Sequence, residues 1–226
     1  INILTIEDPV EYRLEGIGQM QVNPKIGFHF STGLRAILRQ DPDVVLIGET
    51  RDLETAEIAV QASLTGHLVF TTLHTNDAAS SFTRLIDMGV EPFLIASTVL
   101  CAQAQRLVRK LCSECRAPFE ASDVDLELLG VDRKDVPEKA TFYKANGCEE
   151  CAHSGYSGRL GIFEVMQVTD PIRKLILDRS DAQAIKRAAR ESASGMLTLR
   201  EDGAFKVFEG LTTIDEILRV TQQDSG

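Results

Sequence analysis

Short apolar runs alternate with amphipathic segments along the first 75 residues. The runs Asn2–Ile6, Val44–Ile47 and Leu68–Leu73 predict strands, because each is mostly apolar and is bounded by polar or turn-forming residues. Between them, the periodic segments Ser31–Gln40 and Leu53–Leu64 predict helices. Apolar strands that alternate with helices are typical of a parallel sheet covered on both faces. The pattern therefore predicts an α/β fold.

The stretch between the first strand and the first helix predicts an irregular loop or hairpin, because it contains Gly16, Gly18, Pro24 and Gly27. Beyond residue 75, the pattern predicts helices at 77–88 and 91–105 and a strand at 160–168. Further helices are predicted at 171–177, 182–192, 197–208 and 213–221. We expect three parts: a sheet core in residues 1–110, an insert in 111–158 and a mainly helical part in 159–226.

The 226 residues carry 24 basic and 34 acidic side chains, a net charge of −10. A phosphate lattice binds a basic face, so this balance argues against nonspecific binding to nucleic acid. The longest apolar run, Pro92–Ala102, is shorter than the roughly 18 residues of a membrane-spanning helix. The sequence begins with Ile1 rather than Met, directly in an apolar run, so we interpret it as a piece of a longer protein.

Four of the five cysteines form two C-x-x-C pairs with 32 residues between them: Cys112, Cys115, Cys148 and Cys151. Two such pairs separated by a loop suit four thiolates around one tetrahedral Zn²⁺. The alternative is a pair of redox dithiols. Reduced thiols indicate a cytoplasmic setting. The fifth cysteine, Cys101, lies in the longest apolar run, where we expect it to be buried.

Acidic and imidazole side chains follow the predicted strands. Glu7 and Asp8 follow the first strand, Glu49 the second and His74 the third. Ligands of parallel sheets bind at the carboxyl ends of the strands, so these side chains are candidates for one site. In a nucleotide hydrolase, a glutamate placed like Glu49 lies beside Mg²⁺ and the γ-phosphate and orients the attacking water. The alternative is a strand end with no catalytic role.

Glu11 joins Glu7 and Asp8 in a second acidic cluster. Such a cluster can polarise water or bind Mg²⁺ through its waters; the alternative is a solvated turn. His67 and His74 flank one predicted strand and are seven residues apart. This odd spacing predicts side chains on opposite faces, so we do not expect them to be joint metal ligands.

Taken together, these segments resemble the secretion-superfamily ATPases, the hexameric motors of type II secretion and type IV pilus assembly. Ile3–Tyr12 resembles their Asp box, Leu38–Asp52 their atypical Walker B region, and Thr65–Asn76 their His box. The two C-x-x-C pairs resemble the zinc-binding insert of the secretion and pilus-extension branches, and Gly158–Glu164 resembles the segment that follows it. The resemblance implies a RecA-like parallel-sheet ATPase core, a four-cysteine zinc insert and a C-terminal helical subdomain.

The resemblance also implies roles for the acidic residues and three cofactors: ATP, Mg²⁺ and Zn²⁺. Glu49 would be the Walker B glutamate, near Mg²⁺ and the hydrolytic water. Glu7, Asp8 and Glu11 would be the Asp-box acids, with Glu7 the first choice for water activation. The four paired cysteines would be the ligands of Zn²⁺.

By the same resemblance, His67 and His74 would couple the state of the γ-phosphate to contacts between subunits. Arg35, Arg51 and Arg159 would contact phosphate or a neighbouring subunit. A guanidinium suits that task because it is always charged and can fork onto phosphate oxygens, whereas the alternative is a surface ion pair. The resemblance further implies a homo-hexamer that is cytoplasmic and peripheral at the inner membrane. Its implied partners are a membrane platform protein and other secretion or pilus assembly proteins.

The sequence departs from the family pattern at two points. Thr50 stands where many relatives have Ile or Met. The phosphate-binding pattern G-x-x-x-x-G-K-[ST] does not occur in the 226 residues, and in the family it lies one βα unit upstream of the position of Ile1. We therefore expect residues 1–226 alone to be nearly inactive as an ATPase.

The leading hypothesis is the motor domain of a type II secretion ATPase, and the first alternative is a type IV pilus-extension ATPase. Residues 61–68 and 106–112 resemble the secretion motors more than the pilus motors. A second class is a zinc-knuckle module that binds nucleic acid or protein through Arg106, Arg109, Lys110 and Arg116. An aromatic content of 6%, no Trp and the negative net charge argue against nucleic acid. A third hypothesis is a scaffold that fills a ring without turnover.

Overall fold

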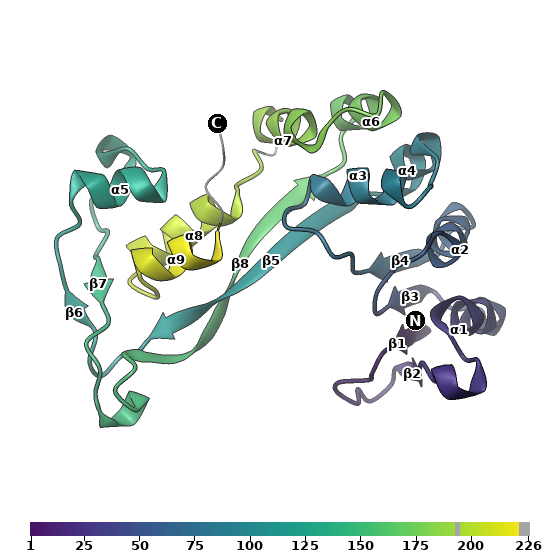
Figure 1. Ribbon diagram of the computed structural model, residues 1–226, viewed down its shortest axis with the longest axis horizontal. Coiled ribbons are helices and arrows are strands. Elements are labelled where there is room, and N and C mark those ends of the chain that lie inside the picture. The colour runs from purple at the N-terminus through teal and green to yellow at the C-terminus, as the bar shows by residue number, and fades with distance from the viewer. Residues whose placement is uncertain (193–194, 222–226) are drawn as a thin grey trace. The chain divides into compact units, whose positions relative to one another are not determined.

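The computed structural model describes residues 1–192 and 195–221, which form two compact units (Figure 1). The sheet unit contains residues 1–102 and 167–189, and the cysteine unit contains residues 103–166 with the described part of 190–226. The three-part division at residues 110 and 158 stays a prediction. Within its last part, residues 193–194 and 222–226 lie outside the described residues.

A parallel sheet organises the sheet unit. Its order is β2-β1-β3-β4, formed by β1 (Ile3–Glu7), β2 (Gly18–Gln21), β3 (Val44–Ile47) and β4 (Leu68–Thr71). All three neighbouring pairs run parallel, which confirms the predicted α/β class. The prediction of a loop or hairpin around Gly18 was wrong for residues 18–21, because an edge strand of sequence Gly-Gln-Met-Gln carries no apolar alternation.

Two helices cover one face of this sheet. They are α1 (Phe30–Ile37), which continues into the 3₁₀ turn η2 (Leu38–Gln40), and α2 (Leu53–Leu64), which spans the predicted residues. Asp52 caps α2 by accepting a hydrogen bond from the backbone N–H of Thr55 at 2.8 Å. The buried core between helices and sheet contains Ile6, Leu34, Ile37, Val45, Ile47 and Ile58. Each fully buried aliphatic side chain of this kind contributes roughly 1.5–3 kcal/mol.

The remaining helices of the sheet unit are α3 (Ser80–Asp87), α4 (Pro92–Thr98), α6 (Asp170–Leu177) and α7 (Ala182–Glu191). The predicted helix at 91–105 was wrong beyond Thr98. Val99 is extended, and β5 (Cys101–Leu111) begins two residues later with burial alternating along the strand. The apolar run 92–102 continues from the helix into the strand, so its hydrophobic pattern does not indicate where the helix ends. Cys101, expected to be buried, is exposed.

The described part of the cysteine unit combines two long strands and two short strands with three helices. β5 pairs with β8 (Tyr156–Gln167), and β6 (Ala117–Pro118) pairs antiparallel with β7 (Tyr143–Lys144). The helices are α5 (Asp123–Leu129), α8 (Leu199–Phe208) and α9 (Ile214–Val220). Their core includes Val108, Leu126, Leu129, Ile162, Val207 and Ile217. Single 3₁₀ turns in the chain are η1 (Pro24–Ile26), η3 (Arg133–Asp135) and η4 (Glu149–Cys151).

None of the described helices combines the length and the apolar character that crossing a membrane requires.

A buried carboxylate joins α9 to β5 within the cysteine unit. The side chain of Glu216 is 2% exposed and accepts hydrogen bonds from the Arg109 backbone N–H (3.0 Å), from the Arg109 guanidinium and from two nitrogens of Arg219 (2.9 Å each). The Arg109 guanidinium also lies 4.0 Å from the centre of the Tyr156 ring. Burial opposes ionisation of Glu216, but the hydrogen bonds from Arg219 and Arg109 outweigh it and lower its pKa to about 2.

Replacing Glu216→Gln should lower the free energy of unfolding in a pH-dependent way. The folded-state pKa of about 2 lies below the ordinary value of 4.5, so the stabilisation is complete above about pH 5 and is lost as the pH falls toward 2. We expect wild type and variant to differ by on the order of 3 kcal/mol at pH 7 and by about 1 kcal/mol less at pH 3.5. Urea unfolding followed by circular dichroism measures both differences.

The control for this series is Glu209→Gln, an exposed carboxylate next to the end of α8. It should change the free energy of unfolding by less than about 0.5 kcal/mol. A Glu216→Gln effect of equal size at pH 7 and pH 3.5 would show that the ionised carboxylate does not supply the stabilisation.

Candidate functional site

Three parallel strands of the sheet unit end at the same level. The register pairs Ile6 of β1 with Ile47 of β3, and Ile47 with Thr71 of β4. The residues that follow these positions therefore meet at one edge of the sheet. They include four side chains identified from the sequence, Glu7, Asp8, Glu49 and His74.

Gly48 lets the ends of β1 and β3 approach closely at this edge. Its N–H donates to the carbonyl of Ile6 at 2.7 Å, which continues the ladder one residue beyond β3. A Cβ atom at position 48 would lie 3.2 Å from the Cα of Glu7 and 3.3 Å from the Ile6 carbonyl oxygen. The hydroxyl of Thr72 donates to the Gly48 carbonyl at 2.6 Å and ties β4 to the same place. A side chain at position 48 would therefore push against backbone, which has little freedom to move.

Glu49 follows Gly48 and lies between two basic side chains. Its side chain is only 12% exposed, and Oε2 accepts hydrogen bonds from Nε of Arg51 and from Nε2 of His74, the latter at 2.9 Å. The His74 side chain is 73% exposed. The sequence singled out all three residues, and the structure brings them together. The arrangement gives a largely shielded carboxylate whose partners can still reach a ligand in solvent.

Glu7 is held by neighbours that sequence reasoning missed. Its Oε1 accepts hydrogen bonds from the hydroxyl of Thr5 at 2.6 Å and from Nε2 of Gln19 at 3.0 Å. Gln19 also donates to the carbonyl of Tyr12 at 3.0 Å and accepts from the N–H of Leu14 at 2.8 Å. Gln19 thus fixes both the carboxylate and the loop that follows β1. No local pattern identifies this residue, because its contacts depend on the parallel pairing of β1 with β2.

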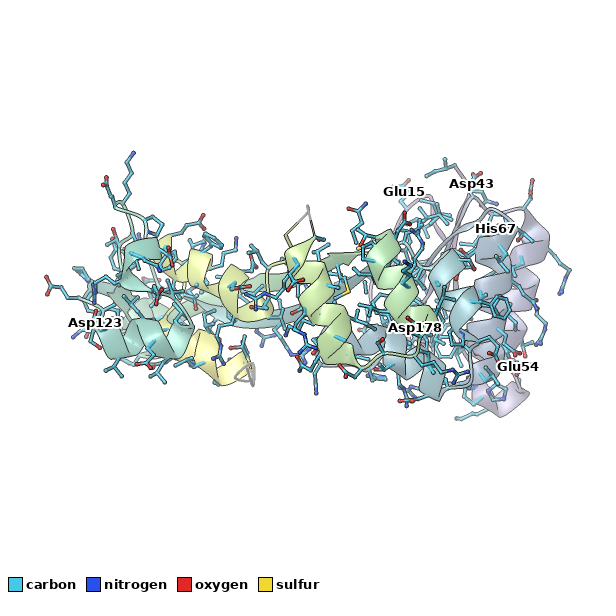
Figure 2. All side chains as sticks on the ribbon, turned by 90° about the horizontal axis from the view of Figure 1, so that it is seen from above. Glu15, Asp43, Glu54, His67, Asp123 and Asp178 are labelled. Atoms are coloured by element: carbon cyan, nitrogen blue, oxygen red, sulfur yellow. The ribbon has the colours of Figure 1, made fainter. Side chains whose placement is uncertain are left out.

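His67 lies at the opposite end of β4 from His74. Its Nδ1 is 2.9 Å from the carbonyl oxygen of Ala62 and 3.1 Å from the hydroxyl of Thr65. The imidazole ring therefore contacts the last turn and the C-cap of α2. Figure 2 labels His67 together with Glu54, which lies in the first turn of that helix. The strand covers only residues 68–71, so the seven-residue spacing separates the two histidines along its length.

The other candidates are more dispersed. Asp8 and Glu11 are exposed in the segment after β1. Arg35 on α1 pairs with Glu54 on α2 at 2.8 Å, and both side chains are about half exposed. Arg159 is exposed on β8 and belongs to the cysteine unit, whereas the other candidate arginines belong to the sheet unit. The catalytic, phosphate and intersubunit roles of these residues stay predictions.

The four paired cysteines form a compact cluster in the cysteine unit. Their sulfur atoms all lie within 4.8 Å of one another. Three separations are 3.9 Å for Cys112–Cys148, 3.8 Å for Cys115–Cys151 and 3.7 Å for Cys148–Cys151. A tetrahedral Zn²⁺ with bonds of about 2.3 Å would hold its sulfur ligands about 3.8 Å apart. The donor set therefore fits zinc in both chemistry and spacing.

Backbone N–H groups surround these sulfurs. Gly147 donates to Cys115 at 3.3 Å, and the N–H groups of Cys148 and Gly155 each donate to Cys151 at 3.2 Å. The Cys148 N–H, followed by that of Gly155, lowers the pKa of the Cys151 thiol to about 6, whereas burial raises the pKa of Cys115 to about 11. Four adjacent thiolates repel one another, so full ionisation of the cluster requires a bound cation.

Comparison with known proteins identifies the family. A profile of the family described as "Type II/IV secretion system protein" matches residues 1–219. The chain belongs to this family. Type II secretion system protein E of Pseudomonas aeruginosa is 56% identical over 99% of this chain and 43% of its own length. Type II secretion system ATPase E of Vibrio cholerae is 52% identical over 98% of this chain and 43% of its own length. Type IV pilus assembly ATPase PilB of Thermus thermophilus is 50% identical over 97% of this chain and 24% of its own length.

Membership of the type II/IV secretion system protein family confirms the resemblance recognised from the motifs. The chain spans less than half the length of these curated relatives. Among solved structures, the pilus retraction motor PilT with bound ADP matches with a TM-score of 0.68 and 26% identity, over 99% of this chain and 53% of PilT. The match supports the α/β ATPase fold for this family member.

Gly48→Ala should destabilise the sheet unit. The added Cβ meets backbone of β1, so the strand ends must separate, at a cost of about 1–3 kcal/mol. Gly18→Ala is a matched control in the same sheet. Its Cβ would lie 2.5 Å from Cδ2 of Leu4, which a rotation of that side chain relieves, and 3.9 Å from the nearest backbone atom, the Ile3 carbonyl oxygen. Urea unfolding of both variants measures the difference. An equal or greater loss for Gly18→Ala would contradict the role given to Gly48.

Cys112→Ser should reduce bound zinc to well below one ion per chain, because a serine hydroxyl replaces a thiolate ligand. Elemental analysis of protein purified under reducing conditions measures the content. Cys101→Ser is the control, since Cys101 is exposed and lies outside the cluster. The Cys101→Ser variant should keep a zinc content near one ion per chain. A wild-type content near zero would exclude zinc as the resident metal.

Proposed function

We propose that the chain carries the ATP-hydrolysing motor region of a type II secretion assembly ATPase. The observation that most supports this function is the shielded Glu49 carboxylate between Arg51 and His74, at the carboxyl edge of a parallel sheet. Ligands bind at this edge in open α/β sheets. The proposal also rests on the relatives named as type II secretion proteins, two of which are more than 50% identical to this chain.

In this mechanism Glu49 orients the attacking water and Glu7 accepts its proton. The water oxygen bonds to the γ-phosphorus, the bond to the bridging oxygen breaks, and ADP and phosphate leave. Carboxylate oxygens are the ligands that Mg²⁺ prefers, so Glu7 and Glu49 would hold that ion directly or through water. When bound, Mg²⁺ would neutralise charge on the phosphate oxygens.

Arg51 and His74 would respond to the nucleotide. Both side chains are mostly exposed, although each donates a hydrogen bond to Glu49. A phosphate carries more charge than one carboxylate and offers several acceptor oxygens, so it competes for these donors. Transfer of the donors to phosphate would free Glu49 for its water. The same transfer would signal the presence of the γ-phosphate to neighbouring elements.

At the level of the whole protein, we propose a homo-hexamer at the cytoplasmic face of the inner membrane. It would use ATP turnover to drive a membrane platform protein that adds pilin-like subunits and supports protein export. Zn²⁺ would hold the four-cysteine cluster as a structural ion. The alternative is a type IV pilus-extension ATPase, because PilB of T. thermophilus is almost as similar as the secretion relatives.

The zinc-knuckle nucleic-acid module receives less support. Two of the basic residues that suggested it make contacts inside the cysteine unit. Arg109 pairs with Glu216, and Arg116 donates to the Gly210 carbonyl at 2.7 Å and lies 4.4 Å from the centre of the Tyr143 ring. These guanidinium groups are occupied by intramolecular partners rather than presented together to a phosphate backbone.

Glu49→Gln in the full-length protein that carries these residues should lower ATP turnover by on the order of 100-fold or more. The amide retains the size of the side chain but cannot act as a carboxylate toward water. Binding of a fluorescent ATP analogue should change by less than about threefold. Phosphate release under saturating ATP measures turnover.

Glu57→Gln is the matched control, because Glu57 is an exposed glutamate on α2 and is not one of the hydrogen-bond partners of Glu49. It should retain turnover. Unchanged turnover in Glu49→Gln would remove Glu49 from the mechanism. Robust turnover by residues 1–226 alone would contradict the expectation that this segment is nearly inactive by itself.

A further inference from the structure

An open groove with an apolar floor lies in the cysteine unit, between α8 and the segment that runs from α5 through η3. Its volume is about 900 Å³. The apolar part of its lining is formed by Leu126, Val131, Leu197, Ala204, Phe205 and Phe208. Small-molecule sites occupy roughly 300–1,000 Å³, so a groove of this volume has room for several side chains of a partner.

Part of this apolar lining faces solvent. Phe205 is 46% exposed and Leu197 is 43% exposed, although both lie beside the buried core. The Phe205 ring packs edge to face against Phe208, with centroids 6.1 Å apart, and this contact stabilises the ring in its exposed position. Exposed apolar side chains that line one groove are typical of interaction sites.

The groove is also strongly acidic. Residues 120–138 hold seven acidic and two basic side chains, a net charge of −5 within a chain whose total is −10. The acidic members of the groove lining are Asp123, Glu127, Asp132, Asp135 and Glu201. Figure 2 labels Asp123 at the start of α5. Arg133 pairs with Asp123, Lys134 with Asp132 and Arg190 with Glu201, so the excess of negative charge on the rim comes from Glu127 and Asp135.

We propose that this groove binds a basic amphipathic helix of a partner protein. The apolar side of such a helix would contact Phe205 and Leu197, and its Lys or Arg residues would meet the acidic rim, which includes Glu127 and Asp135. The charge selects the class of partner, because nucleic acid and anionic lipid would be repelled by the same rim. The proposal concerns the cysteine unit alone and does not depend on ATP hydrolysis.

The test uses a fluorescein-labelled 18-residue peptide with leucine at helical positions i, i+3, i+4 and i+7 and lysine elsewhere. Its affinity for the full-length protein that carries these residues is measured by fluorescence anisotropy. Phe205→Ser should weaken binding by at least tenfold, and Glu127→Lys combined with Asp135→Lys should do the same. The peptide with glutamate in place of lysine should bind at least tenfold more weakly than the lysine peptide.

Matched controls remove the same side chains elsewhere. Phe93→Ser replaces a phenylalanine of the sheet unit that is 59% exposed, and Glu57→Lys combined with Asp178→Lys reverses two exposed charges of the sheet unit. Both should leave the affinity within about twofold. The charge variants lie on the surface, so they test the groove even where Phe205→Ser impairs folding. Absence of binding, equal binding of both peptides, or equal loss in controls and groove variants would each overturn the proposal.

Discussion

The shared register of three parallel strands is the constraint on which the rest of the sheet unit depends. Ile6, Ile47 and Thr71 lie in one row, so the strands end together and whatever follows them meets at one edge. Gly48 allows this because the backbone of β1 approaches the position where a Cβ would stand. The carboxylates of Glu7 and Glu49 are therefore placed by rigid backbone rather than by long flexible loops, which suits precise positioning of a reacting group.

The cysteine unit meets the same need for precision by other means. Around the four sulfurs, backbone N–H groups of two tight turns supply the hydrogen bonds, and the spacing matches a tetrahedral ion. Around Glu216, two arginines and a backbone N–H satisfy a carboxylate that burial would otherwise neutralise. Both clusters connect segments that are distant in the sequence, so each helps to fix the fold of the cysteine unit.

Much of this architecture could be predicted from the sequence, because its signals are local. The apolar runs of β1, β3 and β4, the periodicity of α2 and each C-x-x-C pair are patterns of neighbouring residues. Glu49 and His74 follow the ends of β3 and β4 within three residues. The predictions failed where a contact depends on strand pairing between distant residues, or where one apolar run contains both a helix and a strand. Gln19 reaches Glu7 only through the parallel edge strand β2. The switch from α4 to β5 lies inside one apolar run.

Burial separates ion pairs that hold the structure from those that can exchange partners. Glu216 is 2% exposed and accepts a hydrogen bond from a backbone N–H as well as from Arg109 and Arg219, so its pairing does not depend on half-exposed side chains alone. Arg35 and Glu54 are both about half exposed, and such a pair contributes under about 1 kcal/mol. Glu49 is intermediate: the carboxylate is shielded, but its partners Arg51 and His74 extend into solvent. Among these three carboxylates, Glu49 has the most exposed partners, so its donors are the ones that an incoming anion reaches most easily.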